Sequence, residues 1–559
     1  MLQPTEDQIA IRDHASLSLL AIAPAGCGKT EALALRIAAL AHRGTVQAPR
    51  RILVTTFTNK AKDNLTERLG DYLSPALLRQ RATIANFHGL ATRIIRAHGN
   101  VVGVNPEATI PESDWVADQC RQRNLPFKVS QRIQKVLQTI KQDDIDDSEV
   151  TVRLQELGES VALEIELLRV AEGRLTYDDL PRTASLILAH DAVASLYRNH
   201  FAAVVVDEFQ DLTPQQLRII HRIGAGKTTY AGDIAQGIYS FAGADPASVY
   251  AAITAECTDI LEFSQSHRSS PAVLEAVNAL SSCTGGIQLS AAHPESWPGG
   301  GLVARLDYPA AADEAESIAT LCQFLLKRAP EHRIGVISRI STRRRFVDDA
   351  MNTTDLPFYR WDDGVLDTDT AKIIKAMLTT IESTDFGSST EPLRALRDLA
   401  GLETVHDPDT RRSLVTAIDW CHDLLNAGEN PTTIRKRIRI GENSNLINTP
   451  GVHLLTAHAG KGQQFDWVVA LGIEDDHIPY FEAKTPDSIV EEARVLSVIL
   501  SRARHGTFLT VAANVPNKQG DPWPKKPSRF WEFLNGIYLD RQHATQWLKG
   551  ADWDQLRAV

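Results

Sequence analysis

The chain contains few cysteines and no long hydrophobic run. Its 6 cysteines are widely spaced among 559 residues, with no Cys-x-x-Cys pair. That spacing argues against a zinc site or an iron–sulfur cluster and suits a reducing compartment. No stretch of about eighteen apolar residues occurs, so we expect no membrane span. Residues 1–7 are acidic and lack the apolar centre of a secretory signal, so we expect a cytoplasmic protein.

The sequence also lacks an excess of positive charge. Its net charge is −11, so the composition as a whole does not favour a nucleic-acid partner. An acidic total still permits a basic groove, because only the local field acts on a ligand. The length predicts two to four domains, and the contents of 43% hydrophobic and 23% charged residues are ordinary for a globular protein.

Residues 23–30, Ala-Pro-Ala-Gly-Cys-Gly-Lys-Thr, fit the phosphate-binding loop, with Ala23 at the usual first glycine. The apolar run 19–22 predicts a strand before the loop, and 31–40 predicts a helix after it. Backbone N–H groups of such a loop converge on phosphate oxygens, and the helix N-terminus adds its dipole. Lys29 would reach the β- and γ-phosphates and Thr30 would hold Mg²⁺. The strand–loop–helix setting disfavours the alternative, a chance glycine turn.

A second apolar run, 202–206, predicts a central parallel strand that ends in carboxylates. Ligand chemistry in an α/β sheet lies at such strand ends. Asp207 would therefore hold Mg²⁺, and Glu208 would orient and deprotonate the attacking water. The alternative is an acidic strand end that caps the next helix.

Residues 224–228, Gly-Ala-Gly-Lys-Thr, look like another phosphate loop. His221 stands where the first glycine belongs, and the expected order is helix, turn, strand. We therefore predict a turn at the C-terminus of a helix.

An ordered series of segments resembles the motifs of the UvrD/Rep-type helicases of superfamily one. In chain order the segments are 5–8, 23–30, 55–61, 85–89, 174–180, 207–211, 232–241, 265–269, 456–465, 491–494 with 498–504, and 527–530. The resemblance implies an α/β fold with two RecA-like P-loop NTPase domains, whose parallel sheets are flanked by helices, and with small helical insertions. The implied first domain is 1–106 with 173–275, and its insertion is 107–172. The implied second domain is 276–384 with 449–540, its insertion is 385–448, and 541–559 form a tail.

The resemblance also implies ATP and Mg²⁺ between the two domains. Gln236 would sense the γ-phosphate, and Arg268 and Arg502 would be arginine fingers, although a surface salt bridge is the ordinary alternative for each arginine. The implied catalytic residues are Lys29, Glu208, Gln236, Arg268 and Arg502. The implied metal ligands are Thr30 and Asp207. The implied nucleotide-binding residues are Gln8, Ala23, Pro24, Ala25, Gly26, Cys27, Gly28, Lys29, Thr30, Arg36, His267 and Gln464.

The same resemblance implies single-stranded DNA, or DNA junctions and ends, as partner. Aromatic side chains stack on any base, at roughly 1–3 kcal/mol per base, without reading sequence. For Phe57 and Phe241 the alternative is a place in the hydrophobic core. The implied DNA-binding residues are Phe57, Asn59, Lys60, His88, Tyr239, Phe241 and His458.

Some positions depart from the family pattern. His267 replaces the usual tyrosine beside the adenine, and Gln464 replaces a glutamate near the ribose. Ala242 replaces an arginine, so one link between the γ-phosphate site and DNA is expected to be missing.

The insertions and the tail carry open alternatives. Residues 154–174 predict a helix with Leu154, Leu157, Val161, Ile165 and Leu168 on one face. The basic cluster 435–439 is either a duplex contact or a solvated face, and 343–345 is equally ambiguous. Trp547 and Trp553 would dock on the body of the protein or on a partner.

Two functions remain open. The first is an ATP-dependent single-stranded DNA translocase and helicase, with 3′–5′ polarity by resemblance. The second is a DNA-activated ATPase subunit of a repair or anti-phage complex such as Gabija, which senses or loads DNA for a partner nuclease. The chain shows no nuclease-like cluster of carboxylates and lysine after the last motif. A non-hydrolysing binding module is disfavoured, because the implied catalytic residues are all in place.

Overall fold

The computed structural model describes residues 3–559 apart from 45, 109–114, 258, 362–364, 367, 383–391, 405–407, 427, 441–447 and 518–519. The chain forms two compact units. The first unit is 1–294 with 483–501, and the second is 295–482 with 502–559. Each unit is a mixed α/β structure built on a parallel sheet, as the sequence predicts.

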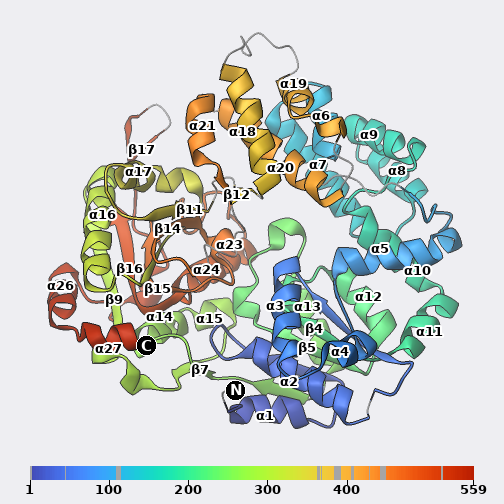
Figure 1. Cartoon of the computed structure of the whole chain (residues 1–559), viewed down its shortest axis with the longest axis horizontal. Helices are drawn as coiled ribbons and strands as arrows, with labels where there is room; N and C mark the ends of the chain where they lie inside the picture. The colour runs from blue at the N-terminus through green and yellow to red at the C-terminus, as the bar shows by residue number, and fades with distance from the viewer. Residues whose placement is uncertain are drawn as a thin grey trace. The chain divides into compact units, whose positions relative to one another are not determined.

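The first unit contains a six-stranded sheet in the order β3-β2-β4-β5-β1-β6, and all of its pairings are parallel. Its central strands β4 and β5 are labelled in Figure 1. Every residue of the central strand β4 is buried, which explains its unbroken run of apolar residues. The strands are β1 (Leu19–Ile22), β2 (Arg51–Thr56), β3 (Ala82–Asn86), β4 (Phe201–Asp207), β5 (Thr228–Gly232) and β6 (Asp259–Glu262).

Helices cover both faces of this sheet, and each face has its own apolar core. One core takes residues from α5, α10, α12 and α13, and the other from α1, α2, α3 and α14. The helices are α1 (Glu6–Asp13), α2 (Lys29–His42), α3 (Asn59–Gly70), α4 (Pro75–Arg81), α5 (Phe87–His98), α10 (Asp179–Ala189), α11 (Asp191–His200), α12 (Pro214–Gly224), α13 (Pro246–Glu256), α14 (Pro271–Ala279) and α15 (Ser281–Thr284). Short 3₁₀ turns are η1 (Gly99–Val102), η2 (Phe209–Asp211), η3 (Ile234–Gln236) and η4 (Ser240–Ala242), and β7 (Gln265–Ser266) pairs with β8 (Ser290–Ala291).

The look-alike segment 224–228 is a helix terminus, as predicted. Helix α12 ends at Gly224, Gly226 has φ 71°, and β5 begins at Thr228. The order is therefore helix, turn, strand, the reverse of a phosphate loop.

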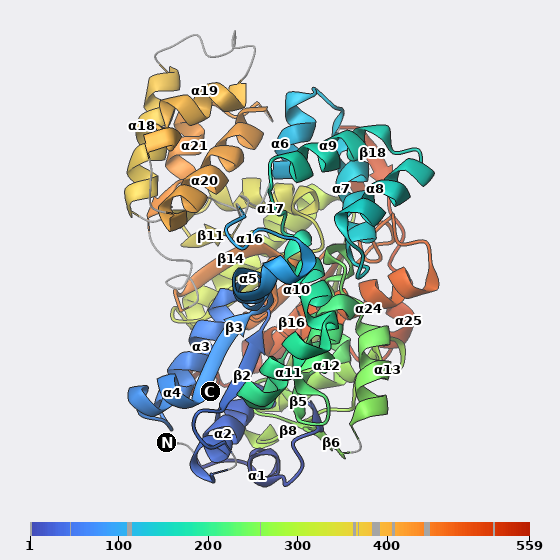
Figure 2. The ribbon, with the colours of Figure 1, turned by 90° about the vertical axis from the view of Figure 1, so that its right-hand side faces the viewer.

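The insertion of the first unit is a small group of helices with its own core, seen as a cyan and green cluster in Figure 2. Its helices are α6 (Trp115–Gln122), α7 (Phe127–Lys141), α8 (Asp147–Glu156) and α9 (Ser160–Ala171). The prediction of one helix over 154–174 is wrong, because α8 ends at Glu156 and Gly158 takes φ 68°. Leu154 and Ile165 are buried, but Leu157 is 60% exposed in the turn.

The second unit contains another parallel six-stranded sheet, in the order β11-β14-β10-β15-β16-β9. Its strands are β9 (Leu302–Tyr308), β10 (Arg333–Ser338), β11 (Phe358–Arg360), β14 (Gly451–Thr456), β15 (Phe465–Leu471) and β16 (Ala503–Ala512). The other elements around the sheet are η5 (Pro294–Ser296), η6 (Pro298–Gly300), α16 (Ala311–Arg328), α17 (Ser341–Asn352), α23 (Ala457–Gly460), the hairpin β17 (Asn514–Pro516) with β18 (Pro522–Pro524), and α25 (Trp531–Leu534).

The insertion of the second unit is helical, and it appears in yellow and orange in Figure 1. Its expected first residue, 385, lies outside the described residues, and α18 already packs into the core of this group from residue 371 onward. The elements are β12 (Val365–Leu366), α18 (Thr368–Glu382), α19 (Pro392–Leu399), η8 (Leu402–Thr404), α20 (Pro408–Asn426), α21 (Pro431–Arg437) and β13 (Arg439–Ile440).

The tail docks on the body of the second unit. Its helices are α26 (Arg541–Gly550) and α27 (Trp553–Ala558). The ring centroids of Trp547 and Trp553 lie 6.2 and 5.8 Å from that of Trp467 on β15. Docking on the body is therefore the alternative that the structure supports.

The compact units divide the chain at other points than the sequence boundaries. Residues 276–294 belong to the first unit, and so does helix α24 (Pro486–Leu500), although it lies between strands of the second sheet in the sequence. The cause is packing, because α24 lies against α14, α15 and η3. Within the described part of the chain, no helix has the length and apolarity needed to cross a bilayer.

Candidate nucleotide and DNA site

The segment 23–28 connects β1 to α2 and takes the backbone shape of a phosphate loop. Gly26 and Gly28 have φ of 88° and 78°, a region that favours glycine. A Cβ on Gly26 would lie 2.7 Å from the Cβ of Arg268, and one on Gly28 would lie 2.5 Å from Nε2 of Gln8. Close neighbours therefore leave no room for a side chain at either glycine. Those neighbours are two residues that the sequence assigns to the same nucleotide.

Gln8 is fixed at the N-terminus of α1. Its Oε1 accepts the Thr5 N–H at 3.0 Å and its Nε2 donates to the Gly28 carbonyl at 3.4 Å. The His267 N–H donates to the Gly26 carbonyl at 2.9 Å, and the imidazole itself is exposed. The expected adenine-side residues thus lie on both flanks of the loop.

The side chain of Lys29 lies between the two carboxylates that end β4. Its Nζ is 2.8 Å from Asp207 Oδ1 and also pairs with Glu208. Only 12% of the Lys29 side chain is exposed. Burial by itself lowers the pKa of Lys29, but the two carboxylates outweigh burial and raise it above its usual range. Burial also raises the pKa of Asp207, which Lys29 opposes. The three side chains therefore form one electrostatic unit at the strand end.

Glu208 has a strained backbone, with φ 58° and ψ 54°. A non-glycine residue in this region costs about 1–3 kcal/mol and persists only where neighbours hold it. The Gln210 side chain is one such neighbour, since its Nε2 donates to Glu208 Oε2 at 2.6 Å. Its Oε1 accepts the Asp233 N–H at 3.0 Å. Gln210 is fully buried, and sequence reasoning missed it although it lies two residues after the expected base.

Asp233 follows β5, the neighbour of β4 in the sheet. Its Oδ2 accepts from Gln236 Nε2 at 2.9 Å, and burial raises its pKa. Hydrogen bonds and ion pairs thus connect Lys29, Glu208, Gln210, Asp233 and Gln236 in one chain of contacts. The expected base and the expected γ-phosphate sensor belong to the same network.

Thr30 lies on the first turn of α2, next to Lys29, and is exposed. A hydroxyl and a carboxylate are oxygen ligands of the kind that Mg²⁺ prefers, so Thr30 and Asp207 fit the expected ion. Arg36 differs from expectation, because both of its terminal nitrogens donate to the carbonyls of His14 and Ser16. Its placement supports a structural role at the entry to β1 and gives no support for a nucleotide contact.

Aromatic side chains gather at the carboxyl edge of the same sheet. The Phe57 and Tyr239 rings stack at 5.1 Å with 18° between their planes, and the Tyr239 and Phe241 rings meet at 5.8 Å. Phe241 is 62% exposed and Phe57 is half-buried, so neither is a core aromatic. We call Phe57, Tyr239 and Phe241 the aromatic row.

His88 lies at the start of α5, which directly follows β3 at the same carboxyl edge of the sheet as the aromatic row. Burial lowers the pKa of His88, which favours a neutral ring that stacks. The ring meets that of Tyr177 at 5.0 Å. Tyr177 is a partner that the sequence analysis did not assign, although the segment 174–180 contains it. Asn59 begins α3, but the side chains of Asn59 and Lys60 lie outside what the structure describes.

The remaining expected residues belong to the second unit. Arg502 is buried there, with Nη1 3.5 Å from the Gln463 carbonyl. The Gln464 side chain is exposed, and His458 lies on α23.

Two family models match this chain. The model of the UvrD/REP helicase N-terminal domain matches residues 4–255, and that of the UvrD-like helicase C-terminal domain matches residues 420–514. The chain belongs to the UvrD-like helicases of superfamily one. Membership of this family makes it an enzyme of the ATP-hydrolysing DNA helicase class.

Several named helicases are similar to this UvrD-like chain. ATP-dependent DNA helicase UvrD2 of Mycobacterium tuberculosis is 25% identical over 561 residues, which cover 92% of this chain and 79% of the relative. UvrD1 of Mycobacterium leprae is 28% identical over 50% of this chain and 39% of its own length. PcrA of Leuconostoc citreum is 30% identical over 47% of this chain and 37% of its own length.

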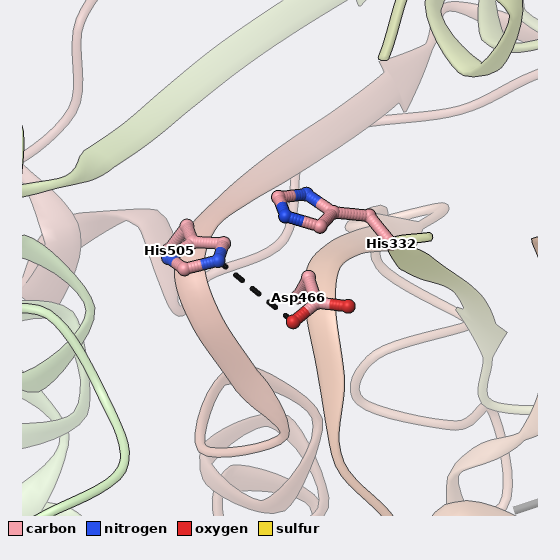
Figure 3. Close-up of side chains that lie close together, drawn as sticks. All are labelled: His332, Asp466 and His505. Carbon is pink, nitrogen blue, oxygen red and sulfur yellow. Dashed lines mark ion pairs between the residues drawn. The ribbon is translucent and has the colours of Figure 1, made fainter. Parts of the chain in front are cut away.

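Outside the UvrD-like motifs, a group of His and Asp side chains lies near the amino ends of β10, β15 and β16. His332, Asp466 and His505 each offer one atom that could bind a metal, and these three atoms lie within 4.8 Å of one another (Figure 3). The Trp467 indole N–H, however, donates to Nδ1 of His332 at 3.1 Å, so the neutral ring carries its own proton on Nε2. That proton occupies the nitrogen a metal would need, and we interpret the group as two buried histidines packed beside Asp466, with His505 Nε2 3.8 Å from its carboxylate.

A second group of acids in the described residues is Asp147, Glu166 and Asp179 in the first unit. Cations already neutralise it. Lys141 Nζ lies 2.8 Å from Glu166 and 3.0 Å from Asp179, and Arg182 lies 2.8 Å from Asp179. The group is an internal ion network that joins the insertion to α10.

The arginines that the structure describes in the two ambiguous basic runs are also paired. Arg343 is buried and pairs with Glu314 at 2.6 Å, Arg344 pairs with Asp348 at 2.8 Å, and Arg345 donates to the Pro516 carbonyl at 2.9 Å. These pairings do not support a DNA contact for 343–345. In the other run, Arg435 and Arg437 pair with Glu382 and Glu429 at 3.0 and 2.5 Å.

Proposed function

We propose that this UvrD-like chain is an ATP-dependent translocase on single-stranded DNA that separates duplex DNA with 3′–5′ polarity. The observation that carries the proposal is the position of the aromatic row. The row and the network from Lys29 to Gln236 lie at the carboxyl ends of neighbouring strands of one sheet. The nine residues from Asp233 to Phe241 include both the expected phosphate sensor and two aromatic side chains.

In this proposal ATP binds at the phosphate loop, with Lys29 on its β- and γ-phosphates. Thr30 and Asp207 would hold Mg²⁺, whose charge would neutralise the phosphates. Glu208 orients the attacking water and accepts its proton, while Gln236 contacts the γ-phosphate. Arg268 and Arg502 supply permanent positive charge toward the phosphoryl oxygens. In the structure the Lys29 ammonium pairs with two carboxylates. A bound phosphate would therefore compete with these carboxylates for the ammonium group.

The aromatic row, with His88, provides flat surfaces for bases, and the chain's net charge of −11 confines any electrostatic grip to local groups. Because a base of any kind can stack, the motor would move along every sequence. His267, Gln464 and His458 complete the proposed contacts to nucleotide and DNA. A DNA substrate is consistent with a cytoplasmic enzyme.

A second candidate function follows from the small insertions and from Ala242. The described helices of the two insertions form compact groups, α6–α9 and α18–α21. A chain with reduced insertions could instead act as a DNA-activated ATPase that senses or loads DNA for a partner nuclease in defence or repair.

The test compares ATP hydrolysis with strand displacement by the purified chain. We expect oligo-dT to stimulate hydrolysis, and a 3′-tailed duplex to be unwound faster than a 5′-tailed or blunt one. Stimulated hydrolysis with streptavidin displacement but no unwinding favours the second candidate. A rate of ATP hydrolysis that does not change when DNA is added contradicts both candidate functions.

The matched lysine variants test the site. Lys29→Ala should abolish hydrolysis, since Lys29 pairs with both carboxylates at the strand end and would contact the β- and γ-phosphates. Lys227→Ala, in the look-alike segment, removes donors only to the Arg198 and Phe201 carbonyls, so each folded molecule should still hydrolyse ATP. A Lys29→Ala protein with normal turnover contradicts the assignment.

A further inference from the structure

Helix α24 belongs to the first unit although its sequence neighbours belong to the second. It begins with a capping box, in which the Thr485 and Ser488 side chains satisfy each other's backbone N–H groups. From Glu492 to Leu500 every residue is buried. The helix is thus a well-formed, firmly packed element, and its two halves contact different parts of the site.

The first half of α24 holds the aromatic row. The Glu491 Oε1 accepts the backbone N–H of Ser240 at 3.1 Å. Ser240 lies between Tyr239 and Phe241, so this bond fixes the backbone of the segment that carries both rings. A hydrogen bond to a charged acceptor is stronger than one between neutral groups. Glu491 therefore restrains the row from outside its own segment.

The middle of α24 is anchored. The Arg494 Nε donates to the Thr284 carbonyl at 3.2 Å, and Arg494 is buried. Thr284 ends α15, and the turn after it packs on η3, where a Cβ on Gly286 would lie 3.0 Å from Ala235 Cβ. This anchor limits rotation of α24 about its own axis.

The second half of α24 reaches the phosphate side. Ser497 on α24 and Ser501, which directly follows the helix, line a hollow whose other walls include Pro24, Ala25 and Gln236. At a rise of about 1.5 Å per residue, Glu491 and Ser501 are separated by roughly 15 Å along the helix. The same helix thus packs on η3, which carries Gln236, lines a hollow together with Pro24 and Ala25 of the phosphate loop, and bonds the aromatic row through Glu491.

We propose that Glu491 is a positioning residue through which α24 couples nucleotide binding at the phosphate loop to the grip of the aromatic row on DNA. The inference rests on the proposed function. A change at Gln236 or the loop shifts the second half of α24, and the Glu491 bond transmits that shift to Ser240.

Coupling of two ligands is reciprocal, which makes the inference measurable at equilibrium. If a nucleotide changes the DNA dissociation constant by some factor, DNA must change the nucleotide constant by the same factor. The wild-type chain should show a factor within the usual range of roughly 5–150-fold. We expect Glu491→Ala to reduce it to less than about twofold, and Glu491→Gln, whose amide oxygen still accepts a hydrogen bond, to retain most of it.

The experiment uses the full chain, fluorescein-labelled oligo-dT and a non-hydrolysable ATP analogue with Mg²⁺. Anisotropy gives the DNA constant with and without the analogue, and calorimetry gives the analogue's constant with and without DNA. Asp487→Ala is the matched control, since Asp487 is an exposed acid on the first turn of the same helix. It should leave the factor unchanged.

Hydrogen exchange separates positioning from general damage. Glu491→Ala should speed exchange in 238–242 while leaving β1 and α2 protected, and its thermal unfolding should stay cooperative. An unchanged coupling factor in Glu491→Ala overturns the inference. So does a wild-type chain that binds both ligands without mutual effect. A wild-type chain that binds neither ligand instead contradicts the proposed function.

Discussion

Gln210 shows how much of the site depends on a single side chain. Its amide donates to Glu208 at 2.6 Å and accepts from the Asp233 N–H at 3.0 Å. A Cβ on Gly232 would lie 2.2 Å from Gln210 Oε1, so the adjacent strand end must be glycine to admit this side chain. Gln210 thus holds the strained Glu208 in place and connects it to the partner of Gln236.

We expect Gln210→Ala to lower kcat by roughly 10–100-fold, the usual effect of losing a supporting hydrogen bond to a catalytic carboxylate. Gln210→Glu should move the acidic limb of the kcat–pH profile to higher pH, because two carboxylates at hydrogen-bonding distance share a proton more readily. Steady-state hydrolysis from pH 5.5 to 9 measures both. Gln216→Glu is the control, since a glutamate preserves its capping box. An unshifted profile in Gln210→Glu would show that the amide does not act on Glu208.

At the scale of elements, strand ends decide which motifs meet. Strands β2, β4, β5 and β1 are neighbours, and their carboxyl ends carry Phe57, Asp207, Asp233 and the phosphate loop. Parallel strands bring these ends to one edge. The aromatic row is therefore a product of sheet order: Phe57 follows β2 and Tyr239 follows β5, yet their rings stack.

Tyr239 is central in the row, so Tyr239→Ala should weaken oligonucleotide binding by about 1–3 kcal/mol, equally for dT and dA. Tyr239→Phe keeps the ring and should bind nearly as wild type. Anisotropy titrations with both oligonucleotides provide the measurement. A loss confined to one base would mean that the row reads sequence and does not simply stack.

At the scale of the whole molecule, the tail packs beside the cluster of His332, Asp466 and His505, in which both histidines are buried. Arg504 Nη1 donates to the Val559 carbonyl at 3.1 Å, and Arg557 pairs with Glu331 at 2.6 Å. Trp553 packs on Trp467, whose indole N–H bonds His332. The tail, β15 and the histidines thus form one packed region of the second unit.

That region should lose stability in mild acid. Burial lowers the pKa of both His332 and His505 below the ordinary 6.5. Both histidines are then neutral in the folded chain and take up a proton more readily when unfolded. Their contribution to the free energy of unfolding is complete above about pH 6.5. It is lost as the pH falls below that value, by up to about 1.4 kcal/mol per pH unit for each histidine.

Tryptophan fluorescence during urea unfolding measures this effect, because Trp467, Trp547 and Trp553 lie in the same region. The urea concentration at the unfolding midpoint should decrease as the pH is lowered from 7.5 to 5.5. In His505→Phe that decrease should be smaller. His543→Phe, an exposed histidine on α26, is the control. Equal pH dependence in wild type and His505→Phe would contradict the prediction.

The sequence by itself determined the motifs and the parallel α/β class, and it predicted the principal site residues. A phosphate loop needs particular residues at consecutive positions, and a buried parallel strand needs an unbroken apolar run, so both are encoded locally. Residue types and order were therefore enough to predict Lys29, Asp207, Glu208 and Gln236. Local pattern failed at 154–174, where a left-handed glycine splits two helices.

Only the tertiary structure decided which of these residues support one another. It buried Arg343 against acids distant in the sequence, turned Arg36 toward two carbonyls, and stacked Phe57 on Tyr239. It also assigned α24 to the first unit and set Gln210 between Glu208 and Asp233. The physical reason is that pairing, burial and packing depend on groups brought together by folding, and no spacing along the chain records those neighbours.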